Sequence, residues 1–457
     1  MNSEGEQAMM QFPTTSNRGR YGLAVLAVAS LLSACNEPDT ILPGKREDIR
    51  SAIADGDTST LAAVTRDAPR AIRLPAAQSN TEWPQGIGSP AFRVSHAALS
   101  GAPQRIWSAD IGAGDGRRQR ITADPVVAGG LVYTLDAQAQ VTATSLAGQT
   151  VWRTDVAPAR DDAAAATGGG LSYDGGRVYA AVGHGALVAL DAASGNVIWR
   201  QNLEGTGSGR PTISGGLVYV TAGDDTGIAL NADTGRIVWQ LSASPDINNV
   251  LGAPAPAVSE DLAIFAFGSG EVQAVFRRGG LRRWDASAVG QRFARALGAV
   301  EDVTGAPVIA GNTVYVGNQA GRIVALNLDS GARLWTAREG AVGPVLPVGD
   351  SVFVISELGE LLRLDASDGT RIWGTQMPNF VNDKPRRRSE VFAHHGPVLA
   401  GGRIYVASND GLLRAFDPES GALVRSTQIP GGATTAPVVA GNVLYVVSTD
   451  GDLHAFR

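Results

Sequence analysis

The chain has one cysteine, Cys35, and the surroundings of that residue indicate what chemistry its thiol could do. A single cysteine excludes an intramolecular disulfide and any metal site built from several cysteines. It closely follows an apolar run over 23–32, which Arg18 and Arg20 precede. Basic residues, about ten apolar residues and then small residues form the pattern of a secretory signal, and the run is short for a membrane-spanning helix. We therefore expect residues 1–34 to be a signal peptide.

The residues that end this segment, Leu32-Ser33-Ala34-Cys35, resemble the bacterial lipobox, in which the cysteine is acylated and becomes the first residue of the mature chain. The resemblance implies palmitate-type acylation of Cys35. Each buried methylene contributes about 0.8 kcal/mol, so several acyl chains anchor a protein stably. Asn36 stands where an aspartate often signals retention in the inner membrane. We therefore expect an outer-membrane lipoprotein that faces the periplasm; a plain signal peptide with an accidental cysteine is the alternative.

Other residues with the potential for chemistry are few. His394-His395 has no third ligand nearby in the sequence, so a polar loop explains the pair better than a metal site. The glycines of 183–185 and 268–270 fall in expected hairpins and do not precede helices, which argues against phosphate binding. Three aspartates close a recurring turn in which a short carboxylate accepts local backbone hydrogen bonds. They are Asp191, Asp365 and Asp417. We therefore expect no catalytic residue, metal or cofactor.

An internal repeat beyond residue 100 must position these residues. Each module has four short β-rich runs, and the second run carries an aromatic residue at intervals of 38 to 52 residues. These aromatic residues are Tyr133, Tyr179, Tyr219, Phe265, Tyr315, Phe353, Tyr405 and Tyr445. A tryptophan follows the first six by nineteen or twenty residues, at Trp152, Trp199, Trp239, Trp284, Trp335 and Trp373. This spacing predicts an all-β, eight-bladed β-propeller of four-stranded antiparallel blades.

The eighth module is incomplete, because the chain stops at Arg457 before the position of its tryptophan. An unassigned β-rich run, 104–109, contains Trp107 and can supply the missing outer strand. Such closure removes an unpaired strand edge. We expect residues 101–457 to form the propeller. Residues 35–100 are predicted to be a mostly extended or disordered tether, with Trp83-Pro84 and Phe92 packed on the propeller surface.

The regular place of the tryptophans predicts packing wedges between blades. The repeat also resembles the quinoprotein alcohol dehydrogenase propeller, the PQQ-like repeat, which implies a quinone, a calcium ion, a catalytic aspartate and two adjacent cysteines. The cysteine pair is absent, because Cys35 is the single cysteine, and no cluster of Asp, Glu and Asn matches the calcium ligands. A quinoprotein-like dehydrogenase, or a periplasmic propeller that binds a ligand on its axis, is therefore the alternative function.

The lipobox, tether, eight repeats and end-to-end closure together resemble the BamB family of lipoproteins from the outer-membrane β-barrel assembly (BAM) machinery. Segments 42–46 and 80–85 are also similar to segments of family members. The resemblance implies a non-catalytic scaffold. Its partners would be the periplasmic (POTRA) domains of BamA and other BAM subunits, and it would aid the folding and insertion of outer-membrane proteins.

Two contact loops of that family can be located in this sequence. The loop Leu-x-Leu-Arg-Gly falls on 248–252, where Val250 keeps an apolar residue and Leu251 replaces the arginine. The loop Asp-Val-Asp-Thr-x-Pro falls on 302–307, where Asp302 is kept and Thr304 replaces the second aspartate. The resemblance implies that these four residues bind the partner from neighbouring blades on one face.

The connections between modules and the charge of the chain bear on partners as well. Connections after Trp284 and Trp373 are the longest, and the second contains the basic run Lys384-Pro385-Arg386-Arg387-Arg388. A solvated loop explains this run, or contact with an acidic partner or anionic headgroups. The formal net charge of −6 gives no support to nucleic-acid binding, which usually needs a basic surplus.

Overall fold

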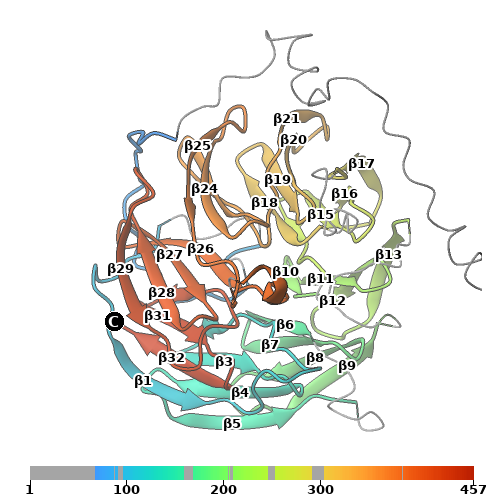
Figure 1. Ribbon diagram of the computed structural model, residues 1–457. Helices are drawn as coiled ribbons and strands as arrows, with labels where there is room; N and C mark the ends of the chain where they lie inside the picture. Colours follow the sequence, from blue (N-terminus) through green and yellow to red (C-terminus); the bar gives the residue numbers. More distant parts are fainter. Residues whose placement is uncertain are drawn as a thin grey trace, which may run out of the picture. The chain divides into compact units, whose positions relative to one another are not determined.

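The computed structural model describes residues 67–86, 88–90, 96–158, 168–203, 205, 209–244, 253–290, 303–382 and 384–457. They form eight four-stranded sheets, and every strand pairs antiparallel with its neighbours. The sheets are blades around a central axis (Figure 1), which confirms the eight-bladed propeller. Cys35, the expected signal peptide and residues up to 66 lie outside the described residues. None of the described residues forms a helix long and apolar enough to cross a membrane.

Blades 1 to 4 follow the chain, and their strands are given from the innermost outward. Blade 1 is β2 (Val126–Ala128), β3 (Leu131–Leu135), β4 (Gln140–Ser145) and β5 (Thr150–Asp155); blade 2 is β6 (Gly169–Asp174), β7 (Arg177–Val182), β8 (Ala186–Asp191) and β9 (Val197–Asn202). Blade 3 is β10 (Thr212–Ser214), β11 (Leu217–Ala222), β12 (Thr226–Asn231) and β13 (Ile237–Ser242); blade 4 is β14 (Ala257–Val258), β15 (Leu262–Ala266), β16 (Glu271–Phe276) and β17 (Arg282–Ser287).

Blades 5 to 8 complete the ring. Blade 5 is β18 (Gly305–Ala310), β19 (Thr313–Asn318), β20 (Arg322–Asn327) and β21 (Arg333–Ala337); blade 6 is β22 (Leu346–Val348), β23 (Ser351–Ile355), β24 (Glu360–Asp365) and β25 (Arg371–Gln376). Blade 7 is β26 (His394–Ala400), β27 (Arg403–Ser408), β28 (Leu412–Phe416) and β29 (Leu423–Gln428); blade 8 is β30 (Val438–Ala440), β31 (Val443–Val447), β32 (Asp452–Phe456) and β1 (Arg105–Asp110).

The hydrophobic core lies between neighbouring blades. One cluster joins Tyr133 and Val141 of blade 1 to Val178 and Val188 of blade 2, and all four side chains are buried. The first three strands of a blade are mostly buried, whereas the outer strand is mostly exposed. Each blade therefore depends on its neighbours for burial of its apolar faces, as in other repeat architectures.

The tryptophans of the outer strands join each blade to the next. Six indole Nε1 groups donate to a carbonyl in the following blade at 2.7–3.0 Å: Trp107 to Leu146, Trp152 to Ala192, Trp199 to Ala232, Trp239 to Arg277, Trp284 to Leu328 and Trp335 to Ala366. Each ring also lies against a glycine of that blade, as Trp199 does against Gly235, where an added Cβ would be 2.6 Å from the indole. The predicted role as packing wedges is confirmed.

The ring closes through strands from the two ends of the propeller. β1 pairs with β32, and Trp107 is the partner of Ala455. The amide of Gln104 and the carbonyl of Arg457 are 2.8 Å apart. This confirms the predicted closure. The closure also explains why Arg425 occupies the tryptophan position of blade 7. The third and fourth strands of blade 8 are not joined by a turn, so a tryptophan at position 425 would have no glycine turn of blade 8 to pack on.

A β-bulge interrupts the pairing of every outer strand just before the tryptophan position. The skipped residues are Ile106, Val151, Ile198, Val238, Arg283, Leu334, Ile372 and Val424. Bulges bend a strand and increase its twist, which makes an exposed edge a poor template for another strand. The eight outer edges are therefore protected against edge-to-edge association.

A strap, residues 67–86, 88–90 and 96–100, runs over the ring. Along the chain its hydrogen bonds reach blades 6, 7, 8, 1, 2, 3 and 4 in turn: Arg70 to Asp365 and to Glu419, Asn80 to Gly441, Trp83 to Val127, Pro84 to Tyr173, Gln85 to Ile213 and Pro90 to Val258. Ala97 then returns to Leu399 of blade 7. Trp83 is buried in the cluster between blades 8 and 1, as expected for a residue packed on the propeller. Phe92 lies outside the described residues.

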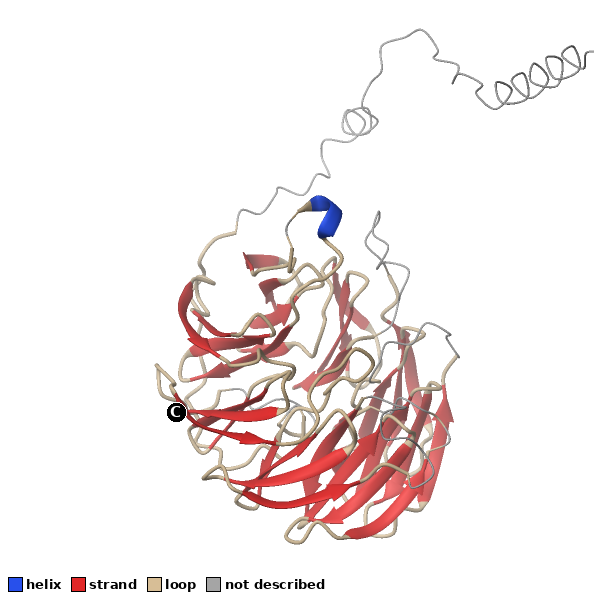
Figure 2. Cartoon of the chain, turned by 60° about the horizontal axis from the view of Figure 1, so that its bottom comes forward, coloured by secondary structure: helices blue, strands red, loops and turns tan. Residues whose placement is uncertain are grey.

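The strap lies on one of the two faces of the ring. It contacts turns between first and second strands, at Gly129 and Gly401, and between third and fourth strands, at Glu419. In an antiparallel blade these turns lie on one face, and the connections between blades lie on the other. We call them the strap face and the loop face. The 3-10 helix η2 (Pro385–Arg387), the one helix among the described residues, lies in the connection from β25 to β26 and projects from the ring (Figure 2).

Candidate functional site

The candidate partner site consists of two connections on the loop face. One joins β13 to β14 and carries Val250 and Leu251; the other joins β17 to β18 and carries Asp302 and Thr304. The topology brings both connections to the same face, on either side of blade 4. Val250, Leu251 and Asp302 lie outside the described residues, so their role stays a prediction.

Thr304 is the one predicted contact residue that the structure describes. Its Oγ1 donates to the carbonyl of Ala341 at 2.6 Å, which ties the start of blade 5 to blade 6. The preceding residue, Val303, is buried in the core between blades 4 and 5. Thr304 therefore lies at the inner end of its connection, beside the central axis, and its contact with a partner also stays a prediction.

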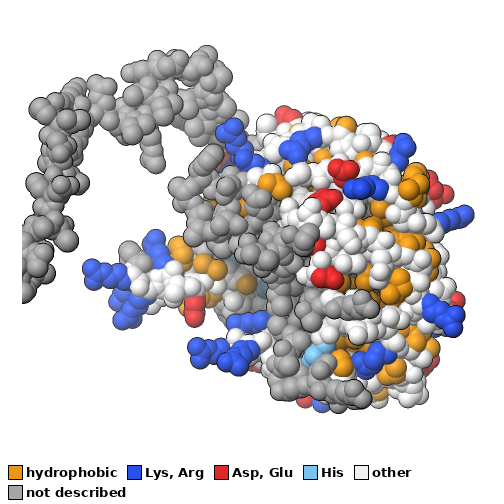
Figure 3. All heavy atoms as spheres, turned by 90° about the vertical axis from the view of Figure 1, so that its right-hand side faces the viewer, with side chains coloured by type: hydrophobic (Ala, Val, Ile, Leu, Met, Phe, Trp, Pro, Cys, Tyr) orange, Lys and Arg blue, Asp and Glu red, His pale blue; other side chains and the backbone are white. Residues whose placement is uncertain are grey.

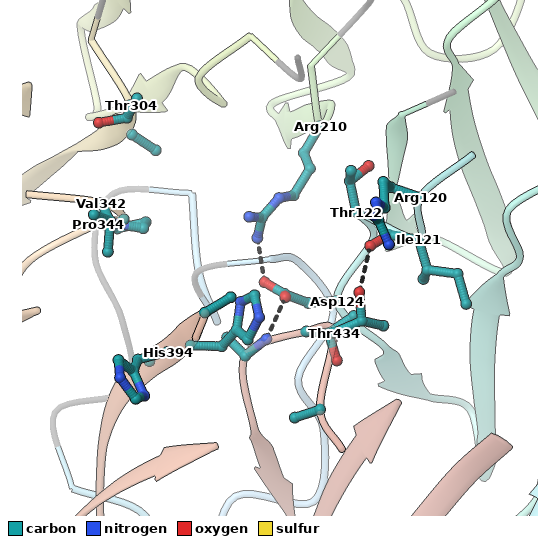
Figure 4. Close-up of a pocket in the computed structure, with 18 of the residues that line it drawn as sticks. Arg120, Ile121, Thr122, Asp124, Arg210, Thr304, Val342, Pro344, His394 and Thr434 are labelled. Carbon is teal, nitrogen blue, oxygen red and sulfur yellow. Dashed lines mark hydrogen bonds and ion pairs between the residues drawn. The ribbon is translucent and has the colours of Figure 1, made fainter. Parts of the chain in front are cut away.

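The loop face opens into a cavity of about 540 Å³ on the central axis. Its walls come from the residues that precede or begin the first strand of each blade, for example Asp124, Arg210, Thr304 and His395. Figure 4 shows Arg210 reaching across this space toward Asp124, with Thr304 and Pro344 on the other wall. The spacing of the repeats had predicted the axis but none of these residues.

An ion pair spans the cavity. Arg210 Nη1 contacts Asp124 Oδ2, and Asp124 Oδ1 accepts the amide of Ala436 at 2.9 Å, so one carboxylate links blades 1, 3 and 8. The Asp124 side chain is buried, and that of Arg210 is about one quarter exposed (26%). Arg210 lies directly over Gly170, where an added Cβ would be 2.0 Å from its Cγ. Because the two charges are paired and the arginine is sterically held, the pair braces the ring.

A second carboxylate of the cavity is also occupied by internal donors. Asp115 accepts the amide of Ile121 at 2.7 Å and Thr434 Oγ1 at 2.9 Å, and it lies 3.6 Å from Arg120. No group of three or more His, Cys, Asp or Glu side chains in the described part of the chain could hold a metal ion. Among the described residues, the axis therefore lacks the clustered carboxylates that a calcium ion would need.

The paired histidines lie at this cavity in β26, so their prediction as a polar loop is wrong. The sequence did not predict that the histidines lie in a strand, because β26 begins at His394 and its apolar residues begin only at Pro397. His394 Nδ1 is 2.7 Å from Ser408 Oγ and its Nε2 is 2.8 Å from the carbonyl of Pro378. Burial lowers the pKa of both rings, that of His395 to about 4. Both rings are therefore neutral at pH 7.

The recurring aspartates are confirmed as turn residues. Asp191 Oδ1 accepts the amide and the hydroxyl of Ser194 at 2.8 and 2.7 Å. These hydrogen bonds lower the pKa of Asp191. Asp365 and Asp417 make the same kind of bond at 2.8 and 3.0 Å. None of the three lines the central cavity.

Most of the propeller matches the model of a known protein family. Residues 137–375 and 382–457 match the family model described as "Outer membrane protein assembly factor BamB". Curated proteins of that name from Salmonella typhimurium and Escherichia coli K12 are each 34% identical over 52% of this chain, and the one from Yersinia pestis is 26% identical over 53%. In all three cases the match spans 62% of the relative's length.

Solved structures agree on the fold. BamB from Moraxella catarrhalis covers 78% of this chain and all of its own, with a TM-score of 0.63 and 18% identity. A europium-containing methanol dehydrogenase covers 82% of this chain and 98% of its own, with a TM-score of 0.61 and 13% identity. An assembly factor and an enzyme thus share the ring, so the fold does not select between their functions.

Proposed function

Because the chain belongs to the family of the outer membrane protein assembly factor BamB, we propose that it is a non-catalytic scaffold of outer-membrane protein assembly. In this proposal Cys35 is acylated, residues 35–100 are the tether, whose last part is the strap, and the propeller hangs in the periplasm from the outer membrane. Its partners are the periplasmic POTRA domains of BamA and other BAM subunits. Its activity is to position them so that outer-membrane proteins fold and insert.

The observation that carries this proposal is the division of the ring into two faces. The strap makes hydrogen bonds to blades 6 to 8 and 1 to 4, and the turns that it contacts lie on one face. The connections that carry Val250, Leu251 and Asp302 leave neighbouring blades on the other face, opposite the turns that the described strap residues contact. Binding specificity on a rigid scaffold usually resides in such connections. The loop face on either side of blade 4 is therefore the surface we assign to BamA.

The central cavity supports the non-catalytic part of the proposal. An enzyme of the quinoprotein class needs acidic ligands and a catalytic carboxylate that are free to act on the axis. Here Asp124 is paired with Arg210, and Asp115 accepts two hydrogen bonds from its own chain. These carboxylates stabilise the connections at the start of the blades, and no reaction step is assigned to them.

The test is affinity purification of the tagged chain from membranes in mild detergent, with mass spectrometry of the proteins that co-elute. The expected result is recovery of BamA, lost when Asp302→Lys and Val250→Asp are combined. Arg236→Glu, at an exposed turn on the strap face, is the control and should retain BamA. Recovery of no BAM subunit by the unaltered chain would refute the scaffold proposal.

The lipid anchor needs its own measurement. The intact mass of the mature chain should correspond to a start at Cys35 plus acyl chains, and Cys35→Ala should abolish the added mass. A mature chain that begins elsewhere, or that carries no acyl group, would contradict the anchor and leave the scaffold proposal to the purification experiment.

A further inference from the structure

The turn before the outer strand of blade 4, on the strap face, lacks the Asp or Asn that five other turns of this kind share, and it carries apolar and basic residues. In blades 2, 3, 5, 6 and 7 the turn before the outer strand begins with Asp or Asn, whose side chain accepts a following amide at 2.8–3.0 Å. These residues are Asp191, Asn231, Asn327, Asp365 and Asp417. In blade 4 the same position, eight residues before the tryptophan, is Phe276, and the turn reads Phe-Arg-Arg-Gly-Gly-Leu-Arg-Arg.

Part of this turn has an internal structural role. Arg277 Nη1 donates to Ser214 Oγ at 3.1 Å, and its carbonyl accepts Trp239 Nε1 at 3.0 Å. The turn itself is closed by backbone bonds, since the amide of Phe276 donates to the carbonyl of Leu281 at 2.9 Å. The turn therefore forms without help from the side chains of its other residues.

Of the remaining side chains, Arg283 donates to the carbonyl of Asp329 at 3.2 Å, whereas the others are exposed and have few partners among the described residues. Phe276 is 41% exposed and Leu281 is 71% exposed, the highest value among the large apolar residues described as exposed. Arg278 makes no hydrogen bond or ion pair with the described residues, and Arg282 lies 3.9 Å from Asp285 at its nearest approach. Figure 3 turns this side of the ring, where Figure 1 labels β13 and β17, toward the viewer and shows hydrophobic, Lys/Arg and Asp/Glu side chains on it.

Exposed apolar side chains flanked by arginines fit the interface of an anionic bilayer. Aromatic and aliphatic groups bind there by leaving water, and basic residues bind there through the negative surface potential. Residues 276–285 contain four arginines and one aspartate, in a chain whose formal net charge is −6. The local charge is therefore opposite to that of the whole chain and complementary to lipid phosphates.

The path of the chain argues for a membrane rather than an acidic protein. The strap begins on the same face, where Arg371 holds Asp67 at 2.9 Å, and residues 36–66 connect it to Cys35. Those 31 residues reach at most about 110 Å when fully extended. An acyl group on Cys35 would hold the propeller within this distance of the leaflet, which raises the effective concentration of headgroups at its surface.

We propose that the turn between β16 and β17 binds anionic phospholipid headgroups, with Phe276 and Leu281 in the interface and Arg278 and Arg282 at lipid phosphates. The contact would turn the strap face toward the membrane and leave the loop face free. This inference rests on the proposed lipid anchor for the closeness of the propeller to the membrane, but the binding itself depends on the residues of the turn.

Hydrogen–deuterium exchange on the mature full chain tests the contact. The chain is bound to vesicles of phosphatidylcholine alone, or with phosphatidylglycerol added at about one third, and uptake is followed for residues 276–285. The turn should exchange several-fold more slowly on the anionic vesicles only. Combining Arg278→Glu with Arg282→Glu should abolish this protection, as should Leu281→Ser. Arg386→Glu with Arg387→Glu, on the loop face, should leave it intact.

The possible results separate the inference from the proposed function. Equal exchange on both kinds of vesicle, with the chain attached to each, would overturn the lipid contact and leave the anchor standing. Protection that requires an added protein rather than anionic lipid would overturn it too, in favour of an acidic partner. A chain that attaches to anionic vesicles but not to phosphatidylcholine would contradict the acyl anchor and support the turn.

Discussion

The buried guanidinium of Arg363, in β24, donates a hydrogen bond to the backbone carbonyl of Arg70 in the strap. The same side chain donates to Ser351 Oγ at 2.9 Å and to the carbonyl of Ala71 at 3.2 Å, and it is 0% exposed. Burial lowers the pKa of Arg363, and the nearby charge of Arg70 lowers it further. One charged group in blade 6 is thus committed to carbonyls of a segment almost 300 residues earlier in the chain.

Arg363→Met should therefore release the first part of the strap. It removes the charge and leaves several buried acceptors without a donor, so we expect the free energy of unfolding to fall by about 3 kcal/mol. Urea titration measures the loss, and limited proteolysis should show earlier cleavage within residues 67–75. Arg236→Met, at an exposed turn of blade 3, is the control and should change stability by less than about 0.5 kcal/mol. Equal effects of the two substitutions would contradict this role of Arg363.

Two glycines isolate the contribution of the tryptophan wedges. Gly235 has φ +70° and an added Cβ would be 2.6 Å from the Trp199 ring, whereas Gly216 has φ +77° and open space around it. Both Gly→Ala substitutions pay the left-handed backbone penalty of about 1–2 kcal/mol. Gly235→Ala should lose about 1–3 kcal/mol more, because the wedge must shift. Thermal or urea unfolding of the pair measures the difference, and equal losses would mean that the ring can move without penalty.

The sequence predicted the parts of the fold that have a period and missed the parts that do not. Tyr133, Trp152 and their counterparts recur at fixed spacing because every blade must fill the same gap, so blade number, wedges and closure followed. Part of the strap is held by backbone pairing, as at Ala97, and such pairing needs no particular side chain. The rest is held by side chains far apart in the sequence, such as Arg70 and Asp365. The pair Arg210–Asp124 joins residues 86 apart, a separation that no local motif marks.

The seam between blades 7 and 8 makes a prediction from the same geometry. Arg425 stands at the wedge position, but the following blade offers no covalent turn with a glycine. Arg425→Trp should therefore give no stabilisation, and its free energy of unfolding should stay within about 0.5 kcal/mol of the original. A gain of more than about 1 kcal/mol in urea titration would show that the seam has an unfilled wedge site.

The stability of the ring should fall in mild acid because the pKa values of several histidines lie below the usual value. Burial lowers the pKa of His395 to about 4, and it lowers those of His394 and His454 as well, from the usual value of 6.5. The unfolded chain then binds more protons than the folded chain between pH 6.5 and pH 4, so the free energy of unfolding falls as the pH is lowered through this range.

Replacing one of these rings tests that origin. Between pH 6.5 and pH 4, His395→Gln should reduce the loss of unfolding free energy by less than about 3 kcal/mol. The effect stays below this limit because the ring lines a cavity and keeps some contact with water. Urea titrations at several pH values measure the slope. A slope that is unchanged in His395→Gln would assign the acid sensitivity to other groups.

The brace between Arg210 and Asp124 should contribute to stability as a pair. Asp124→Asn keeps an oxygen for the amide of Ala436 but leaves Arg210 without its counter-ion in a partly buried place, and Arg210→Met leaves the buried carboxylate of Asp124 without one. Because each single change strands a charge, the double substitution should lose less than the sum of the two, with a coupling energy of about 1–3 kcal/mol. A double-mutant cycle from urea titrations measures this coupling. Additive losses would mean that Arg210 and Asp124 act independently and that their ion pair does not stabilise the contact between their blades.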